Sequence, residues 1–224
     1  MKTLVIGAAI IDIIMKIKRL PKSGEDILCS ETMTTVGGCA YNVAGTLRGF
    51  GVEHDLFVPV GRGMYGDMIA GDLENLGYPI LIREEERDNG YCLCLVEEDG
   101  ERTFITVKGA EGCFRSSWFE PLSPDAYDSI YVAGYQVCGG GGRVISGWME
   151  SAGDSLREKR VFFAPGPVIT GIESPVMERI LSVNPILHIN EKEAFDYTKQ
   201  ETVEDCLRYL HSLNHNLVVV TMGA

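Results

Sequence analysis

The sequence has no strongly basic stretch. Its 224 residues carry 20 Lys and Arg against 32 Asp and Glu, a net charge of −12, and the densest basic run is Lys16-Ile17-Lys18-Arg19. A protein that binds nucleic acid or an anionic membrane surface needs a basic patch. The composition therefore predicts neither a nucleic-acid partner nor an anionic membrane surface as partner.

Zinc-site spacing and a membrane anchor are also missing. The seven cysteines are scattered and include no Cys-x-x-Cys pair, so they are interpreted as small apolar residues in a reducing compartment. The apolar run that ends at Met15 is interrupted by Asp12, has no small-residue cleavage site and is too short to span a membrane. These features predict a cytoplasmic protein with no membrane partner.

Two common nucleotide-binding motifs do not occur where they would be needed. No Gly-x-x-x-x-Gly-Lys-Ser/Thr sequence is present, which excludes a P-loop kinase. The first strand is followed by Gly7-Ala8-Ala9 and not by Gly-x-Gly-x-x-Gly, so a dinucleotide-dependent dehydrogenase is unsupported.

What the sequence does contain is an alternation of apolar strands with amphipathic helices. This alternation predicts an α/β fold, a doubly wound and mostly parallel sheet, and the length predicts one domain over 1–224. Strands are predicted at 3–7, 56–61, 129–134, 161–163, 186–190 and 217–222, and helices at 40–49, from 66 to 76, from 143 to about 159, from 191 to about 197 and from 203. Asp67 is expected to cap the second of these helices, and Thr202 with Asp205 to form a capping box.

A second, smaller sheet is predicted outside the main one. Residues 91–108 contain two β-prone runs joined by Asp99-Gly100, a strong hairpin signal. Residues 15–36 alternate loosely with Thr and Ser and are expected to pair with this hairpin as a lid.

The segment Gly37-Gly38-Cys39-Ala40-Tyr41-Asn42 is the first candidate for a binding site. Glycines at a helix N-terminus let a ligand approach the backbone, where N–H groups are unpaired. Asp12 is the second candidate, because a lone carboxylate in an apolar strand is costly to bury without a partner. It is interpreted either as a solvent-facing side chain or as an acceptor for ligand hydroxyls.

Taken in order, these motifs resemble those of the ribokinase-like, or PfkB-type, carbohydrate kinase family. The matches are Asp12, Gly37-Gly38-x-x-x-Asn42-x-Ala44, Val60-Gly61-x-Gly63-x-x-Gly66-Asp67, Asn190-x-x-Glu193 and Val220-Thr221-Met222-Gly223-Ala224. The resemblance spans essentially the whole chain. It implies an α/β core with a β-sheet lid, the cofactors ATP and Mg²⁺, a sugar or nucleoside as the acceptor, and a homodimer formed through the lid.

The resemblance also implies roles for particular residues. Asp12, Gly37, Gly38 and Asn42 would bind the substrate, and Glu111 would face it. Asn190 and Glu193 would lie near the phosphate, with Glu193 reaching magnesium through water. The alternative for this pair is a helix cap with an acid in the first turn. Thr221 and Gly223 would meet the nucleotide.

One family motif is absent from these 224 residues. The resemblance implies a Gly-Ala-Gly-Asp segment after the last strand, which would supply the catalytic base and the anion hole. Ser151-Ala152-Gly153-Asp154-Ser155 looks similar but lies too early, in an expected helix. The natural chain is therefore expected to continue, with the base beyond residue 224, and these residues alone to be inactive or weakly active.

Three hypotheses follow. The first is an ATP-dependent sugar or nucleoside kinase, the second a non-catalytic relative that binds the same ligands, and the third an α/β protein whose glycines serve packing only. Ribose, a ketohexose and a nucleoside such as pseudouridine all stay open as acceptors.

Overall fold

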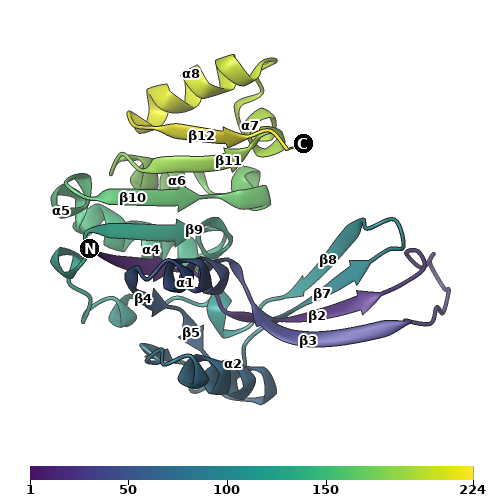
Figure 1. Cartoon of the computed structure of the whole chain (residues 1–224). Helices are drawn as coiled ribbons and strands as arrows, with labels where there is room; N and C mark the ends of the chain where they lie inside the picture. The colour runs from purple at the N-terminus through teal and green to yellow at the C-terminus, as the bar shows by residue number, and fades with distance from the viewer. Residues whose placement is uncertain (224) are drawn as a thin grey trace.

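The computed structural model describes residues 1–223 and is built around a six-stranded parallel sheet (Figure 1). The strands are β1 (Lys2–Ile6), β4 (Glu53–Phe57), β9 (Ser129–Ala133), β10 (Arg160–Ala164), β11 (Ile186–Asn190) and β12 (Val218–Thr221). Their order is β12-β11-β10-β9-β1-β4, so the chain builds the sheet outward in both directions from β1 and β9. The predicted doubly wound α/β fold is confirmed.

Helices cover both faces of this sheet. They are α1 (Cys39–Gly49), α2 (Met64–Asn75), α3 (Gly134–Val137), α4 (Gly140–Ser151), α5 (Gly153–Arg157), α6 (Ser174–Leu181), α7 (Glu191–Thr198) and α8 (Val203–Asn214). Short 3-10 helices lie at η1 (Ala110–Gly112), η2 (Ser116–Trp118), η3 (Pro124–Ala126) and η4 (Gly166–Gly171).

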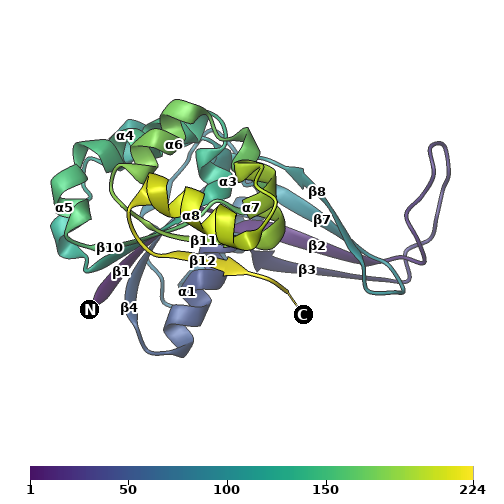
Figure 2. The same cartoon turned by 90° about the horizontal axis from the view of Figure 1, so that it is seen from above.

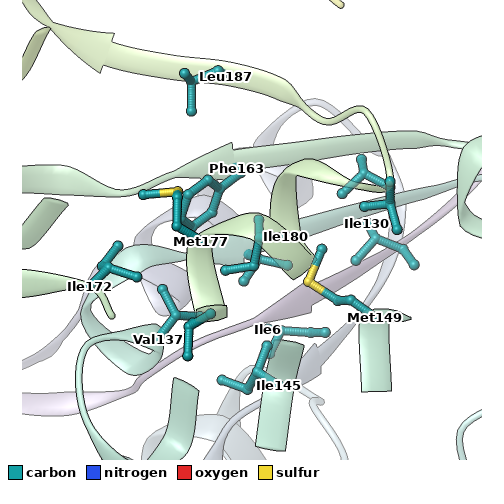
Figure 3. Close-up of a cluster of buried hydrophobic side chains, with 14 of the residues drawn as sticks. Ile6, Ile130, Val137, Ile145, Met149, Phe163, Ile172, Met177, Ile180 and Leu187 are labelled. Atoms are coloured by element: carbon teal, nitrogen blue, oxygen red, sulfur yellow. The ribbon is translucent and has the colours of Figure 1, made fainter. Parts of the chain in front are cut away.

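Successive side chains of β1 pack into two different hydrophobic clusters, one on each face of the sheet. Leu4 and Ile6 belong to the larger cluster, together with apolar residues of α4, α5, α6, α7 and α8, and Figure 3 shows part of it around Ile6 and Phe163. Val5, between them, belongs to the smaller cluster under α1 and α2. Successive strand residues point to opposite faces, so a fully apolar strand is expected where both faces are covered.

The second sheet projects from the main one and has the order β3-β2-β7-β8 (Figures 1 and 2). Its strands are β2 (Ile10–Lys16), β3 (Glu31–Gly37), β7 (Tyr91–Val96) and β8 (Arg102–Val107), and β7 and β8 form the predicted hairpin. We call this four-stranded sheet the lid. It begins at Ile10, earlier than the predicted residue 15, because β2 pairs with β3 and β7 along its whole length. Asp12 therefore lies on the lid. A separate parallel pair joins β5 (Pro59–Val60) to β6 (Ile82–Arg83).

Several helix boundaries differ from the prediction. Residues 140–142 form the first turn of α4, so this helix begins before the predicted residue 143, and the single helix expected up to 159 is divided into α4 and α5. The predicted capping box at Thr202 is half formed. Thr202 Oγ1 accepts a bond from the Asp205 N–H at 3.1 Å, but its hydroxyl donates to the Asp205 carboxylate at 2.8 Å.

Asp67 does not cap α2, contrary to the prediction. The helix begins at Met64, and Gly63 precedes it. Its N-terminal amides are satisfied from another segment, because Asp88 accepts bonds from the N–H groups of Gly66 at 2.6 Å and Tyr65 at 3.2 Å. Within residues 1–223, no helix combines the length and apolar character that crossing a membrane requires.

Candidate functional site

A cavity of about 350 Å³ lies between the lid and the carboxyl edge of the main sheet. The sequence-predicted residues Asp12, Gly38, Asn42 and Glu111 all line it, although they come from three different parts of the chain. A larger surface groove of about 540 Å³ runs beside α4 around Trp148, but none of the predicted site residues line it. The lid cavity is the stronger candidate, because ligands in open α/β sheets bind outside the carboxyl ends of the strands.

Asp12 contributes a carboxylate to the lid side of this cavity. It lies on β2 opposite Thr35 of β3 and Cys92 of β7, and it is half-buried. Burial raises its pKa above the ordinary value of 3.8. No residue in the described part of the chain donates a hydrogen bond to its carboxylate or forms an ion pair with it. The carboxylate is therefore available to a ligand, as the second interpretation of Asp12 required.

The glycine pair makes room for this carboxylate and for the turn into α1. A Cβ at Gly37 would overlap the Oδ2 atom of Asp12. Gly38 has a φ of +104°, and a Cβ there would lie 2.6 Å from the carbonyl oxygen of Ala8. Asn42 follows in the first turn of α1, with its side chain exposed at the cavity. Gly38 is needed both for its backbone conformation and for the close approach of Ala8.

Glu111 lines the cavity but is already occupied by the protein. Its side chain is 3% exposed. Its Oε2 accepts a bond from the Gly90 N–H at 2.9 Å, and its Oε1 accepts one from the Gly109 N–H at 2.8 Å. These amides lie at the two points where the hairpin of the lid joins the core. The geometry indicates that Glu111 clamps this junction, which weakens the expectation that it faces the ligand directly.

Three polar residues of this region were not identified from the sequence. Gln136 of α3 lines the cavity, and its buried Oε1 has no hydrogen-bond partner within residues 1–223. Lys108 lines it from the lid side. Asn89, which is 4% exposed, accepts from the Gly61 N–H at 2.6 Å and donates to the carbonyls of Ala9 and Pro59. For Gln136 a signal existed, since it follows the carboxyl end of a parallel strand.

Asn190 and Glu193 lie away from the cavity, at the start of α7. Asn190 Oδ1 accepts from the Glu193 N–H at 2.8 Å. The Glu193 carboxylate in turn accepts from the backbone N–H of Asn190 at 3.1 Å and from its side-chain amide at 2.8 Å. This is a capping box, the local structure that the alternative interpretation of the pair described.

The last predicted residues are adjacent to this cap. Thr221 of β12 is paired in register with Asn190 of β11, and its hydroxyl donates to the Ile189 carbonyl at 3.4 Å. Gly223 follows with a φ of +72°. Ala224, which ends the quoted motif, lies outside the described residues.

Tyr135 is an aromatic residue of the cavity. It lines the cavity from α3, and its pKa is raised first by burial and then by the nearby Cys39, Cys92 and Glu193.

The segment from Ser151 to Ser155 lies at the other end of the molecule. It joins α4 to α5, and α5 leads into the amino end of β10, opposite the cavity (Figure 1). Asp154 is fully exposed and pairs with Arg157 at 2.8 Å. The position supports the expectation that this segment is not an anion hole.

Comparison with known sequences gives a consistent family. The model of the pfkB family carbohydrate kinases matches residues 2–224. A protein of Escherichia coli (strain K12) described as an uncharacterized sugar kinase, YegV, is 36% identical over 191 residues, which are 85% of this chain and 58% of that protein. A ribokinase of Arabidopsis thaliana is 26% identical over 235 residues, which cover 98% of this chain and 59% of that protein. The chain thus spans less than two thirds of the length of these relatives.

Solved structures share the fold. The ribokinase of Giardia lamblia superposes with a TM-score of 0.82 at 21% identity, over 99% of this chain and 69% of that one. A Cryptococcus neoformans ribokinase solved with ADP gives 0.75 at 19% identity, over 100% and 73%. A Burkholderia thailandensis nucleoside kinase solved with inosine gives 0.72 at 16% identity, over 99% and 70%.

Proposed function

Because the chain belongs to the pfkB family of carbohydrate kinases, we propose that it binds the acceptor of an ATP-dependent transfer of phosphate to a sugar or nucleoside hydroxyl. The observation that carries this proposal is the Asp12 carboxylate, which lines the cavity and has no partner in the described chain. Two adjacent hydroxyls can donate to its two oxygens. A ligand that supplies these donors offsets the cost of burying the charge.

The other acceptor contacts come from α1 and α3. Asn42 offers both a donor and an acceptor, and Gly37 and Gly38 let the ligand approach the backbone. Gln136 contributes an amide whose buried oxygen lacks a partner within residues 1–223. Glu111 would act indirectly, because its carboxylate accepts bonds from the backbone at both ends of the lid hairpin.

We propose ATP and Mg²⁺ as cofactors, with the nucleotide beside Thr221 and Gly223. The Cryptococcus relative solved with ADP supports this assignment. Residues 1–223 contain no cluster of three metal-ligating side chains. Glu193 nevertheless fits Mg²⁺, which keeps several waters and uses one or two carboxylates together with substrate phosphates. When bound, the ion would neutralise charge on the transferred phosphate. Asn190 orients the Glu193 carboxylate.

For catalysis, we propose that these 224 residues transfer phosphate slowly or not at all. The segment from Ser151 to Ser155 lies away from the cavity, so the base and the anion hole would come from residues beyond 224. A preorganised anion hole is typically the largest electrostatic term in such a reaction. A non-catalytic binder of the same ligands is therefore the second candidate. We also propose a cytoplasmic location, since unpaired cysteines such as the seven here are typical of reducing compartments.

A panel experiment separates these functions. The 224-residue protein and a version extended by its natural reading frame would be incubated with ATP, Mg²⁺ and pentoses, hexoses or nucleosides, with calorimetry in parallel. We expect both to bind at least one acceptor and only the extended protein to phosphorylate it rapidly. Failure of the folded proteins to bind or phosphorylate any of them would contradict the proposed function.

We propose that two copies associate through their lids. Ile105 and Val107 lie on the lid face opposite Phe104 and Thr106, which line the cavity, and they are 52% and 44% exposed. An apolar sheet face of this kind is typical of an interface. Sedimentation should show a dimer that Ile105→Lys converts to a monomer, whereas Gln200→Lys, at an exposed position after α7 and outside the lid, serves as a charge control. A monomeric wild-type protein at micromolar concentration would exclude this interface.

A further inference from the structure

The cavity between lid and core has an apolar wall that the acceptor contacts named above do not use. Phe104 lines it from β8 of the lid, and Tyr135 lines it from α3 of the core. Both aromatic rings are unusually accessible, at 58% and 39% exposed. Leaving this much aromatic surface in water is unfavourable, so the position of both rings at one cavity points to a ligand that covers them.

The strand register places Phe104 on the same lid face as Asp12. Asp12 is paired with Cys92, and Phe104 is paired with Cys94, two residues further along β7. Side chains two apart on a strand share a face. A ligand held by Asp12 therefore reaches Phe104 along the lid, and the next residue of β8, Ile105, points away.

Tyr135 faces the cavity from the opposite side. A Cβ added at Gly166 would lie 3.7 Å from its Cε2 atom, so the ring packs against the backbone of η4. This contact limits the movement of the ring. The two rings thus supply one wall on the lid and one on the core.

The cavity is divided chemically. Asp12, Asn42 and the backbone at Gly38 recognise hydroxyl groups, whereas Phe104 and Tyr135 offer flat apolar surface. A free monosaccharide carries hydroxyls around its ring, and those facing the aromatic wall would lose their hydration without gaining partners. A nucleoside has hydroxyls at one end and a flat, stackable base at the other.

Resting on the proposed function, we propose that the acceptor is a nucleoside whose base is held between Phe104 and Tyr135 while its ribose hydroxyls bind Asp12 and Asn42. Base stacking on an aromatic side chain tolerates different bases, because every base has a π-face. We call Phe104 and Tyr135 together the clamp. The clamp therefore selects nucleosides over free sugars more strongly than it selects one base over another.

Calorimetry on the 224-residue protein tests the clamp without requiring catalysis. The probes are uridine, adenosine and ribose. We expect either nucleoside to bind at least about tenfold more tightly than ribose, the gain that one stacked base typically provides. Phe104→Ala and Tyr135→Ala should each weaken nucleoside binding about tenfold and leave ribose binding unchanged.

Matched variants control for unfolding and for the loss of any aromatic ring. Phe104→Leu keeps an apolar side chain but removes the flat face, so it should behave like Phe104→Ala. Phe50→Ala removes a ring that is 81% exposed at the end of α1 and does not line the cavity, so it should bind like the wild type.

The outcomes separate the two proposals. Ribose or a hexose that binds as tightly as the nucleosides, or that weakens equally in Phe104→Ala, would overturn the clamp and leave the kinase proposal standing. If neither nucleosides nor sugars bind the folded protein, the proposed function fails, and the clamp fails with it.

Discussion

Replacing Asp12 with Asn should weaken acceptor binding by about 100-fold, because hydrogen bonds to a charged group each contribute ~1.5–3 kcal/mol and the carboxylate is expected to accept two. Asn keeps one oxygen and presents an NH₂ group to the second hydroxyl. The substitution also removes a half-buried charge, so the fold should be as stable as the wild type or more so. Calorimetry with the best acceptor of the panel measures the effect.

Asp154→Asn is the matched control, because it removes one negative charge from a fully exposed position at the opposite end of the sheet. It should bind as the wild type does. Equal affinity of Asp12→Asn and the wild type would show that Asp12 is a solvent-facing residue without a role in binding.

The pH dependence of binding gives an independent check on Asp12. Burial raises its pKa from the ordinary value of 3.8, so the carboxylate loses its charge at a higher pH than an exposed aspartate. Acceptor binding should weaken as the pH falls through this raised pKa. The effect on stability runs the other way, because the folded state binds the Asp12 proton more tightly than the unfolded state does. The contribution of Asp12 to the free energy of unfolding is therefore greatest below the unfolded-state pKa, and it is lost as the pH rises through the folded-state pKa. Acid should therefore weaken binding through Asp12 without destabilising the fold through the same residue. Asp12→Asn should remove this decline in binding.

The second large effect is expected at Glu111. Glu111→Gln should lower the free energy of unfolding by ~3 kcal/mol, because the Gln side chain accepts a bond from only one of the amides of Gly90 and Gly109. Its NH₂ group then meets the other N–H, which is left buried and without an acceptor. Urea unfolding followed by circular dichroism measures the change, and Glu98→Gln, in the exposed turn of the lid hairpin, is the control.

Glu111 also distinguishes a positioning role from direct contact with the ligand. If Glu111 positions the lid junction, Glu111→Gln should lower the free energy of unfolding and weaken ligand binding together. Unchanged stability with weaker binding would instead mean that the carboxylate meets the ligand, as the sequence alone suggested.

Much of the fold was predictable because its signals are local. The apolar strands 3–7 and 129–134, the hairpin around Asp99-Gly100 and the helix after Gly38 each depend on periodicity or turn chemistry within a few residues. The cavity was partly predictable as well. Asp12 was a candidate because a lone carboxylate interrupts an apolar strand, and Asn42 because it follows a glycine pair at a helix N-terminus; both line the cavity.

Other features depended on partners distant in the sequence. The motif Gly61-x-Gly63-x-x-Gly66 suggested a helix capped by Asp67, but Gly61 and Gly63 make room for residues 87–89, where a Cβ at either glycine would collide. Asp88 then caps α2 across 22 positions of sequence. No local pattern identifies such a partner, because the contact exists only after the lid has folded back onto the core.

The sequence by itself determined the order of strands and helices, the lid hairpin and the family, since periodicity, turn residues and ordered motifs are properties of short segments. The tertiary structure alone decided that Glu111 accepts both amides at the lid junction, that Gln136 and Phe104 reach the cavity, and that Asp12 faces it without a partner within residues 1–223. The physical reason is that hydrogen-bond satisfaction and burial are sums over neighbours in space, and those neighbours come from segments that only folding brings together.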